Sequence, residues 1–565
     1  MDPLRGLAEL RRRRSAPYLL ELDVTEPLLQ ERPSDPLGRL QSRRRTPLPV
    51  LLRALNDAVT DPKVCGLIAK VGSPRLGLAQ AQEIRQAIAR FRGQGKPAVA
   101  WSETFGELSA ATVSYYLAAG FDEIWLQPSG GVGLVGVAAG SLFFADALDQ
   151  AGIRRQIGTR HEYKSAANIF LERSFSEPER EATGRVLASA FEQVIAGVAE
   201  GRRIDEGLVH SLVDRAPLVA KEAYEAGLID RLGYRDQVYA DVRHRTSADA
   251  QLLFAGRYRR HHSVPQQVRR TIERRRGVVA VITGNGTIRL GRSARGPLSG
   301  GSMGSDTVGA ALRAAEREER VRAIVFRVNS PGGSYVASDA IWREVTRLRE
   351  SRKPVVVSMG DVAASGGYFV AAPADAIVAE PGTLTGSIGV LGGKVSIDEL
   401  LERLGVHHDW ISEGRHARMM SPFDEYSPDE WQRLSSWLDA IYEDFVQKVA
   451  AGRSMTTEAV HEVARGRVWT GADAHERGLV DELGGLDRAV SLARERSGLS
   501  GDAEAVACPS TPPLARLRAP RSSEDPASVE VSFDLKGPLT FLARRLGLPS
   551  AGPLIMAPLD GWSAP

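Results

Sequence analysis

The chain has 565 residues, of which 43% are hydrophobic and 25% charged, and these values exclude a disordered, collagen-like or coiled-coil protein. At about 150 residues per domain, the length predicts three to four domains or fewer large ones. The formal net charge of +3 argues against a protein that binds nucleic acid by charge alone, and the distant cysteines Cys65 and Cys508 indicate neither a disulfide framework nor a zinc site.

The N-terminal segment does not read as a targeting signal. The basic run at 11–14 is followed by a stretch with acidic residues, where a signal peptide needs an apolar core. No run of about 18 apolar residues occurs along the sequence, so no transmembrane helix is predicted. We therefore expect a cytoplasmic or peripherally membrane-associated protein.

The two halves of the chain resemble each other in four blocks that follow in the same order. The block AATVSYYLAAGFDEIWLQPSGGVG, starting at Ala110, matches AASGGYFVAAPADAIVAEPGTLTG, starting at Ala363, without a gap. The other paired blocks are 64–74 with 321–331, 152–170 with 405–423, and 222–233 with 473–484. Four matches in one order indicate an internal duplication.

Each half reads as alternating strands and helices. In the second half, apolar and β-branched runs predict buried strands at 277–285, 321–329 and 354–360. Between them, residues 306–319 and 336–353 have helical spacing.

A long helix is also predicted in each half, at 176–201 and at 427–452. Both segments open with Ser, Pro and acidic residues, which is typical of a helix start. Strands that alternate with helices indicate βαβ units and largely parallel sheets. The predicted fold class is therefore α/β, with one such domain in each half.

The segments outside the repeats are of two kinds. Residues 257–276 contain eight arginines, which is typical of a solvated linker, with a patch for a membrane surface or an acidic partner as the alternative. After about residue 500 the chain becomes rich in Pro and Ser, which is typical of a tail. The predicted domains are an N-terminal repeat at 1–255, a linker at 256–276, a C-terminal repeat at 277–500 and a tail at 501–565.

Positions that differ inside the matched blocks are candidates for chemistry rather than folding. Ser365, followed by two glycines, aligns with Thr112, and Lys164 aligns with Ala417. Taken alone, Ser365 is typical of a helix N-cap and Lys164 of a surface lysine. Because each half lacks the group that the other carries, the sequence predicts one Ser/Lys pair assembled from both halves.

A Ser/Lys pair has a clear chemical use. A serine hydroxyl becomes a strong nucleophile when a base removes its proton, and a lysine that burial keeps neutral can be that base. Backbone N–H groups are also needed to stabilise the oxyanion, and Gly332 and Gly333 in NSPGGS, with Gly366 directly after Ser365, are the candidates. The matching loop of the first half, 72–77, lacks the double glycine, so we expect it to have lost this role.

The segments RVNSPGGS and MGDVAASGGYFVAAPADAIVAEPGTLTGSIGV, with YKSA in the first half, closely resemble the signal peptide peptidase A family in its long, duplicated bacterial form. The resemblance covers roughly residues 50 to 500 and implies two tandem ClpP/crotonase-like βαβ spiral domains. It implies that Ser365 is the nucleophile, Lys164 the general base and Ser387 the serine that orients the lysine amine. Ser165, beside the lysine, is an alternative hydroxyl.

The resemblance also implies a function. Members of the family cleave peptides, including signal-peptide remnants, and form rings of protomers, which implies a serine endopeptidase without metal or cofactor and a homo-oligomeric ring, with a tetramer expected. Members commonly carry an N-terminal membrane anchor that is not found here, so peripheral membrane contact through the arginine-rich linker or the tail is the expected substitute. Two alternatives stay open: a crotonase-like acyl-CoA enzyme and a non-catalytic membrane-associated scaffold. No nucleic-acid partner is expected.

Overall fold

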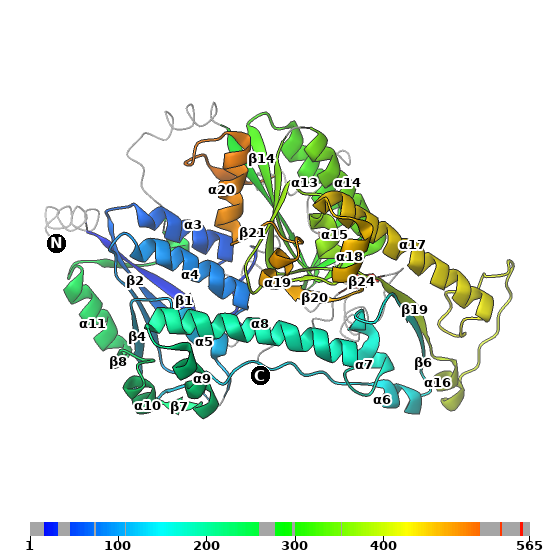
Figure 1. Cartoon of the computed structure of the whole chain (residues 1–565), viewed down its shortest axis with the longest axis horizontal. Helices are drawn as coiled ribbons and strands as arrows, with labels where there is room; N and C mark the ends of the chain where they lie inside the picture. Colours follow the sequence, from blue (N-terminus) through cyan, green and yellow to red (C-terminus); the bar gives the residue numbers. More distant parts are fainter. Residues whose placement is uncertain are drawn as a thin grey trace, which may run out of the picture. The chain divides into compact units, whose positions relative to one another are not determined.

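The structure is a computed structural model of the whole chain (Figure 1). It describes residues 16–31, 46–72, 75–107, 109–258, 277–296, 300–351 and 353–508, and the short strands at 532–533 and 554–556. The described residues form two compact units. The first contains the described residues up to Ala138 and those from Ala188 to Tyr258, and the second contains Ala139–Leu187 and those from Gly277 onward.

The first unit is built on a six-stranded sheet in which every pair of neighbours is parallel. Its strand order is β8-β4-β3-β2-β1-β9. The strands are β1 (Tyr18–Val24), β2 (Val64–Val71), β3 (Ala98–Ser102), β4 (Glu123–Leu126), β8 (Arg231–Leu232) and β9 (Gln251–Phe254). The helices are α3 (Leu48–Val59), α4 (Leu78–Arg92), α5 (Thr112–Ala118), α9 (Glu206–Arg215), α10 (Ala220–Glu225) and α11 (Arg235–Arg245).

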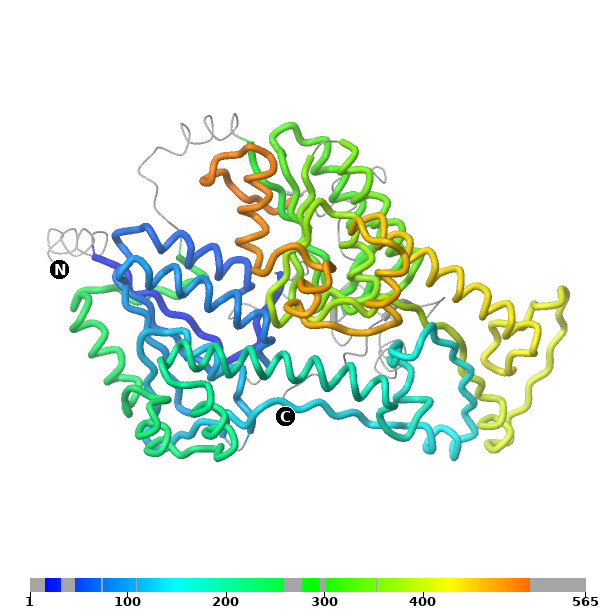
Figure 2. Tube along the Cα trace, viewed as in Figure 1, coloured from blue at the N-terminus to red at the C-terminus, as the bar shows by residue number. Residues whose placement is uncertain are grey.

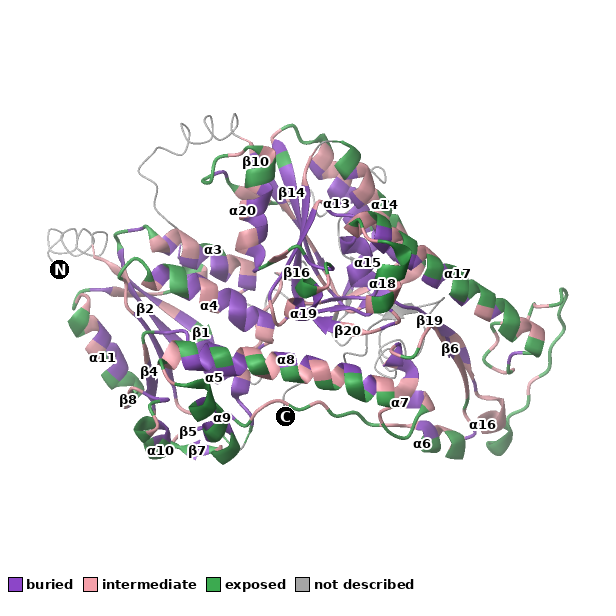
Figure 3. Ribbon diagram, viewed as in Figure 1, coloured by how far each residue is buried: buried purple, intermediate pink, exposed green. Residues whose placement is uncertain are grey.

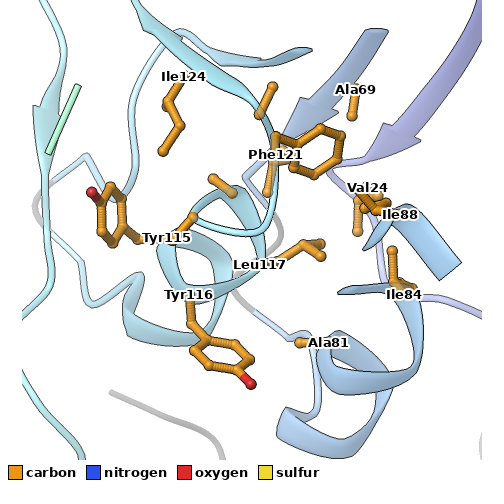
Figure 4. Packing of buried hydrophobic residues seen from close by; sticks show 14 of the residues in the cluster. Val24, Ala69, Ala81, Ile84, Ile88, Tyr115, Tyr116, Leu117, Phe121 and Ile124 are labelled. Atoms are coloured by element: carbon orange, nitrogen blue, oxygen red, sulfur yellow. The ribbon is translucent and has the colours of Figure 1, made fainter. Parts of the chain in front are cut away.

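Helices α4 and α5 supply much of the apolar core of this unit. Ile84 and Ile88, one turn apart on α4, belong to the same buried cluster as Leu117 of α5 and Phe121 (Figure 4). The cluster also includes Ala69 of β2, so the helices bury their apolar faces against the sheet.

The main sheet of the second unit repeats the strand order of the first. Its order β22-β10-β14-β16-β17-β21 corresponds to β9-β1-β2-β3-β4-β8, and all of these pairs are parallel. The strands are β10 (Val278–Asn285), β14 (Val321–Ser330), β16 (Val355–Ala364), β17 (Ala376–Ala379), β21 (Glu482–Leu483) and β22 (Ala505–Ala507), and β18 (Leu384–Gly386) and β20 (Val468–Thr470) continue from β16. The central strands β14 and β16 are mostly buried (Figure 3).

A second sheet of this unit joins segments that are far apart in the sequence. Its order is β23-β12-β13-β11-β15-β24-β19-β6. The strands are β6 (Arg154–Thr159), β11 (Thr287–Arg289), β12 (Ala294–Gly296), β13 (Gly300–Gly304), β15 (Gly332–Ser334), β19 (Leu391–Ser396), β23 (Ser532–Phe533) and β24 (Leu554–Met556). Strand β6 pairs antiparallel with β19 along its whole length, and Figure 2 shows the two traces side by side.

The elements predicted from the second half are confirmed with shifts of a few residues at their ends. The predicted strands correspond to β10, β14 and β16, and the predicted helices to α13 (Ser305–Arg317) and α14 (Tyr335–Glu350). The two long helices are α8 (Glu177–Arg202) and α17 (Pro428–Arg453). The prediction of an α/β fold with parallel sheets is confirmed.

The compact units do not coincide with the predicted sequence repeats. Residues 139–187 belong to the first repeat but lie in the second unit, because β6 takes its hydrogen-bonding partner from β19. Residues 505–507, placed in the predicted tail, form β22 and extend the main sheet beside β10.

The predicted membrane contacts involve the arginine-rich linker and the C-terminal tail, and the structure describes few residues of either segment. The arginine-rich linker lies outside the described residues from 259 onward, so its membrane contact stays a prediction. Within the described part of the chain, every helix is too short or too polar to cross a bilayer.

Candidate active site

Ser365 lies at a sharp turn between the end of β16 and helix α15 (Gly366–Ala371). Its backbone has φ 55° and ψ −114°, which is a strained conformation for a residue with a side chain. Two hydrogen bonds hold the turn: the Ser365 N–H donates to the Gly386 carbonyl at 2.7 Å, and its carbonyl accepts from the Phe369 N–H at 2.8 Å. Ser365 is completely buried.

Lys164 follows β6 and enters the second unit with it. Its Nζ lies 2.8 Å from Ser365 Oγ, 2.9 Å from the Ser387 carbonyl oxygen and 3.0 Å from Ser387 Oγ. A neutral amine has two N–H donors and one lone pair. The two Ser387 oxygens can therefore accept the N–H bonds while the Ser365 hydroxyl donates to the lone pair.

Burial sets the protonation state of this amine. Lys164 is only 1% exposed, and loss of hydration, which penalises the ammonium form, lowers the pKa of Lys164 well below its ordinary value of 10.5. A buried neutral amine in contact with a serine hydroxyl is suited to act as its general base.

Ser387 lies at a second strained turn, directly after β18. Its φ is 52°, and its N–H donates to the Arg467 carbonyl at 2.6 Å. Because both its hydroxyl and its carbonyl contact Lys164 Nζ, Ser387 fixes the direction of the amine.

The candidate oxyanion glycines lie against each other. A Cβ on Gly366 would come within 3.1 Å of Gly332 Cα and 3.2 Å of Gly333 N, and a Cβ on Gly333, where φ is 152°, would lie 2.1 Å from the Ile288 carbonyl oxygen. The Gly332 N–H already donates to Ser330 Oγ at 3.1 Å. The N–H of Gly366, at the first position of α15, is not used within the helix. The Gly366 N–H is thus placed for the donor role, and Gly333 stays the candidate from the loop because the Gly332 N–H is engaged.

The aligned positions of the other repeat serve different purposes. Thr112, the counterpart of Ser365, is buried and its hydroxyl donates to the Gly136 carbonyl at 2.7 Å. Ala417, the counterpart of Lys164, is exposed in a loop.

The structure shows which group Ser165 contacts. It also brings two glycines, Gly466 and Gly389, against Lys164, which were not predicted from the sequence. The Ser165 hydroxyl bonds the Glu179 carboxylate instead of the lysine amine. Gly466, at φ 88°, covers Lys164 so closely that a Cβ there would lie 2.5 Å from Lys164 N, and a Cβ on Gly389 would lie 3.2 Å from Lys164 Cδ. Gly466 aligns with Arg215 in the first repeat, so the comparison of repeats that selected Lys164 holds a signal for it.

Strands β15 and β19, beside the candidate oxyanion glycines, are separated by the width of one strand, and this space is called the slot below. Strand β15 forms one edge and β19 the other, and β24 occupies the space between them, antiparallel to both. In this register Gly333 is opposite Ile555, and Leu391 is opposite Leu554. An extended chain can therefore bind beside the oxyanion glycines through its backbone.

Comparison with known proteins gives consistent matches. The profile of Peptidase family S49 matches residues 90–249 and 347–500. "Serine protease SPPA, chloroplastic" from Arabidopsis thaliana is 32% identical, over 80% of this chain and 66% of that protein. "Protease 4" of Salmonella typhi is 33% identical over 80% and 72%, and "Protease 4" of Haemophilus influenzae is 31% identical over 78% and 72%, respectively. Among solved structures, a ClpP1 mutant from Listeria monocytogenes aligns with 40% of this chain and 99% of its own at 14% identity. Its TM-score of 0.25 is too low to support a conclusion about fold or function.

These matches and the parallel α/β fold define the chain as a serine protease. The chain belongs to peptidase family S49. The predicted resemblance to the signal peptide peptidase A family is confirmed.

Proposed function

We propose that the chain is an endopeptidase with a Ser/Lys dyad, in which Ser365 is the nucleophile and Lys164 the general base. The observation that carries this proposal is the 2.8 Å contact between the buried Lys164 amine and the Ser365 hydroxyl. The contact supports a hydrolase over the alternatives of a crotonase-like acyl-CoA enzyme and a non-catalytic scaffold, because neither of those requires a neutral amine on a serine.

The reaction proceeds in two stages. Lys164 takes the Ser365 proton as Oγ attacks the peptide carbonyl, and the resulting ammonium then protonates the leaving amine as the peptide bond breaks. A water molecule next gives a proton to the neutral Lys164 and attacks the acyl-enzyme, and the proton returns to Ser365 Oγ when the ester bond breaks. The N–H groups of Gly333 and Gly366 stabilise the oxyanion in both stages.

The substrate is proposed to bind as an extended strand in the slot between β15 and β19. The backbone pairing of β24 with both edges supports this binding mode. Cleaved signal peptides are the proposed substrate class, supported by the name of a relative from Enterococcus faecium, "Putative signal peptide peptidase SppA", which is 37% identical over 33% of this chain and 54% of that protein.

The chain is further proposed to hold two tandem ClpP/crotonase-like domains and to assemble into a homo-oligomeric ring, with a tetramer expected. The same strand order in the two sheets supports the tandem arrangement. Large apolar side chains that are exposed around residues 404–420 of the second unit, Leu404, Val406, Trp410, Ile411 and Met420, support contact with another protomer.

Substitution of the dyad tests the proposal. With a fluorogenic peptide as substrate, Ser365→Ala and Lys164→Ala should each lower kcat by about 10³-fold or more, because each removes the activated nucleophile. Thr112→Ala, at the aligned position of the other repeat, is the matched control and should keep its activity. Substantial activity in both dyad variants would overturn the proposal.

A further inference from the structure

Glu179 is a buried acid of the second unit that has no part in the chemistry proposed above. It is 5% exposed and lies at the third position of α8. The Asn168 side-chain amide donates to Glu179 Oε2 at 2.9 Å. The Ser165 hydroxyl and the Ser176 backbone N–H also bond this carboxylate.

Two of these three donors belong to the segment that carries the lysine. Ser165 is the residue after Lys164 and the first residue of the 3₁₀ turn η1 (Ser165–Ala167), and Asn168 is the residue directly after that turn. The Glu179 carboxylate therefore contacts the residue that begins, and the residue that follows, the 3₁₀ turn next to Lys164.

The simpler explanation of Glu179 is a helix cap, and the second repeat shows what a cap alone looks like. Glu430, at the aligned position of α17, forms a capping box with Ser427, whose N–H donates to Glu430 Oε2 at 2.9 Å. That hydrogen bond lowers the pKa of Glu430, whereas burial raises the pKa of Glu179. A cap does not need the burial or the extra donors that Glu179 has.

We propose that Glu179 is a positioning residue, which acts through Ser165 and Asn168 to hold Lys164 Nζ on Ser365 and to keep water away from the amine. The proposal rests on the proposed dyad, because it assigns Glu179 a role only if Lys164 is the base.

The charged groups on the neighbouring segments are engaged with one another. Glu162 pairs with Arg465, and Glu181 pairs with Arg467 at 2.8 Å. The nearby carboxylate of Glu172 repels the negative charge on Glu179 and so helps to raise the pKa of Glu179. Loss of hydration is therefore the main influence on the Lys164 amine, and a looser turn that admits water should raise its pKa.

The informative variants cut the link between Glu179 and the lysine turn without removing the helix cap. Ser165→Ala, Asn168→Ala and the double variant should lower kcat by about 10- to 100-fold, because small displacements of a catalytic group have effects of this size. KM should stay unchanged. The acidic limb of the kcat profile should move to higher pH, which a general loss of stability would not cause. Glu430→Ala, which removes the capping carboxylate at the aligned position of the other repeat, is the matched control and should keep the wild-type pH profile.

The outcomes separate this proposal from the dyad. If Lys164→Ala is inactive while the Ser165 and Asn168 variants keep the wild-type kcat and pH limb, Glu179 is a cap only and the positioning proposal is wrong. If Lys164→Ala keeps activity, the dyad itself is wrong. Circular dichroism shows which variants are folded, and Ser165→Ala, which removes one hydroxyl, provides the test if Asn168→Ala does not fold.

Discussion

The amine of Lys164 lies 2.8 Å from the hydroxyl of Ser365, although the two residues are 201 positions apart and belong to different sequence repeats. The contact forms inside one compact unit, because β6 pairs with β19 and carries Lys164 into that unit. Thr112 stands at the position aligned with Ser365, and Ala417 at the position aligned with Lys164. The aligned positions of the two repeats therefore supply one Ser/Lys pair.

The burial of Lys164 predicts a specific pH dependence of stability. The pKa of Lys164 is lowered in the folded protein, so between that pKa and 10.5 the unfolded chain holds one more proton than the folded chain. This group therefore makes the free energy of unfolding increase with pH in that window, by about 1.4 kcal/mol per pH unit. Urea unfolding of wild type and Lys164→Met across pH 7 to 10 measures the difference. Equal slopes for the two proteins would show that the lysine is charged when folded.

Ser387 is predicted to affect kcat rather than substrate binding. Ser387→Ala removes one of the two Ser387 acceptors of the amine and leaves the carbonyl, which should lower kcat by about tenfold, the equivalent of one neutral hydrogen bond, with KM unchanged. Thr385→Val is the control, because Thr385 Oγ1 bonds the Ala363 carbonyl and not the lysine. Steady-state kinetics of both variants decide the matter, and equal losses of kcat in the two would contradict a specific role for Ser387.

The position of β24 predicts that the C-terminal segment competes with substrate. A chain that ends at residue 553 lacks β24, so KM for a peptide should fall several-fold while kcat is unchanged. A chain that ends at residue 556 keeps β24 and is the matched control. A KM that is the same in both truncated chains would show that β24 does not compete for the slot.

The exposed apolar residues at 404–420 predict an interface between protomers. A charged pair of substitutions, Leu404→Asp with Ile411→Asp, should lower the mass measured by light scattering to that of a smaller assembly or a single chain, since both side chains are largely exposed in the isolated chain. Leu290→Asp, at another exposed leucine, should leave the mass unchanged. An unchanged mass in the double variant would place the interface elsewhere.

The fold was accessible from the sequence because buried parallel strands and amphipathic helices have regular patterns. Strands such as β14, which is buried along most of its length, read as continuous apolar runs. That residues 139–187 belong to the second unit could not be predicted, because β6 is mostly polar, β19 contains two glycines and a lysine, and the two strands lie far apart in the sequence. No local pattern encodes which distant strand an edge strand will choose.

The candidate site could be predicted from the sequence at the positions where the two repeats differ. Lys164 and Ser365 stand out because Ala417 and Thr112 replace them in the other repeat. Gly332 was named with Gly333 from the same loop, and only the structure shows that the Gly332 N–H is engaged by Ser330. A positioning role for Glu179 could not be predicted from the sequence, because its spacing from Ser176 also fits an ordinary helix cap.

The most direct test of the central claim is to trap the acyl-enzyme. Wild-type protein is mixed with an activated peptide ester, quenched in acid and mapped by mass spectrometry. The dyad predicts an acyl group on Ser365 in the wild type, and at most a trace in Lys164→Ala at the same time point, because the amine must accept the serine proton. Acylation of another residue, or equal acylation of Ser365 with and without Lys164, would contradict it.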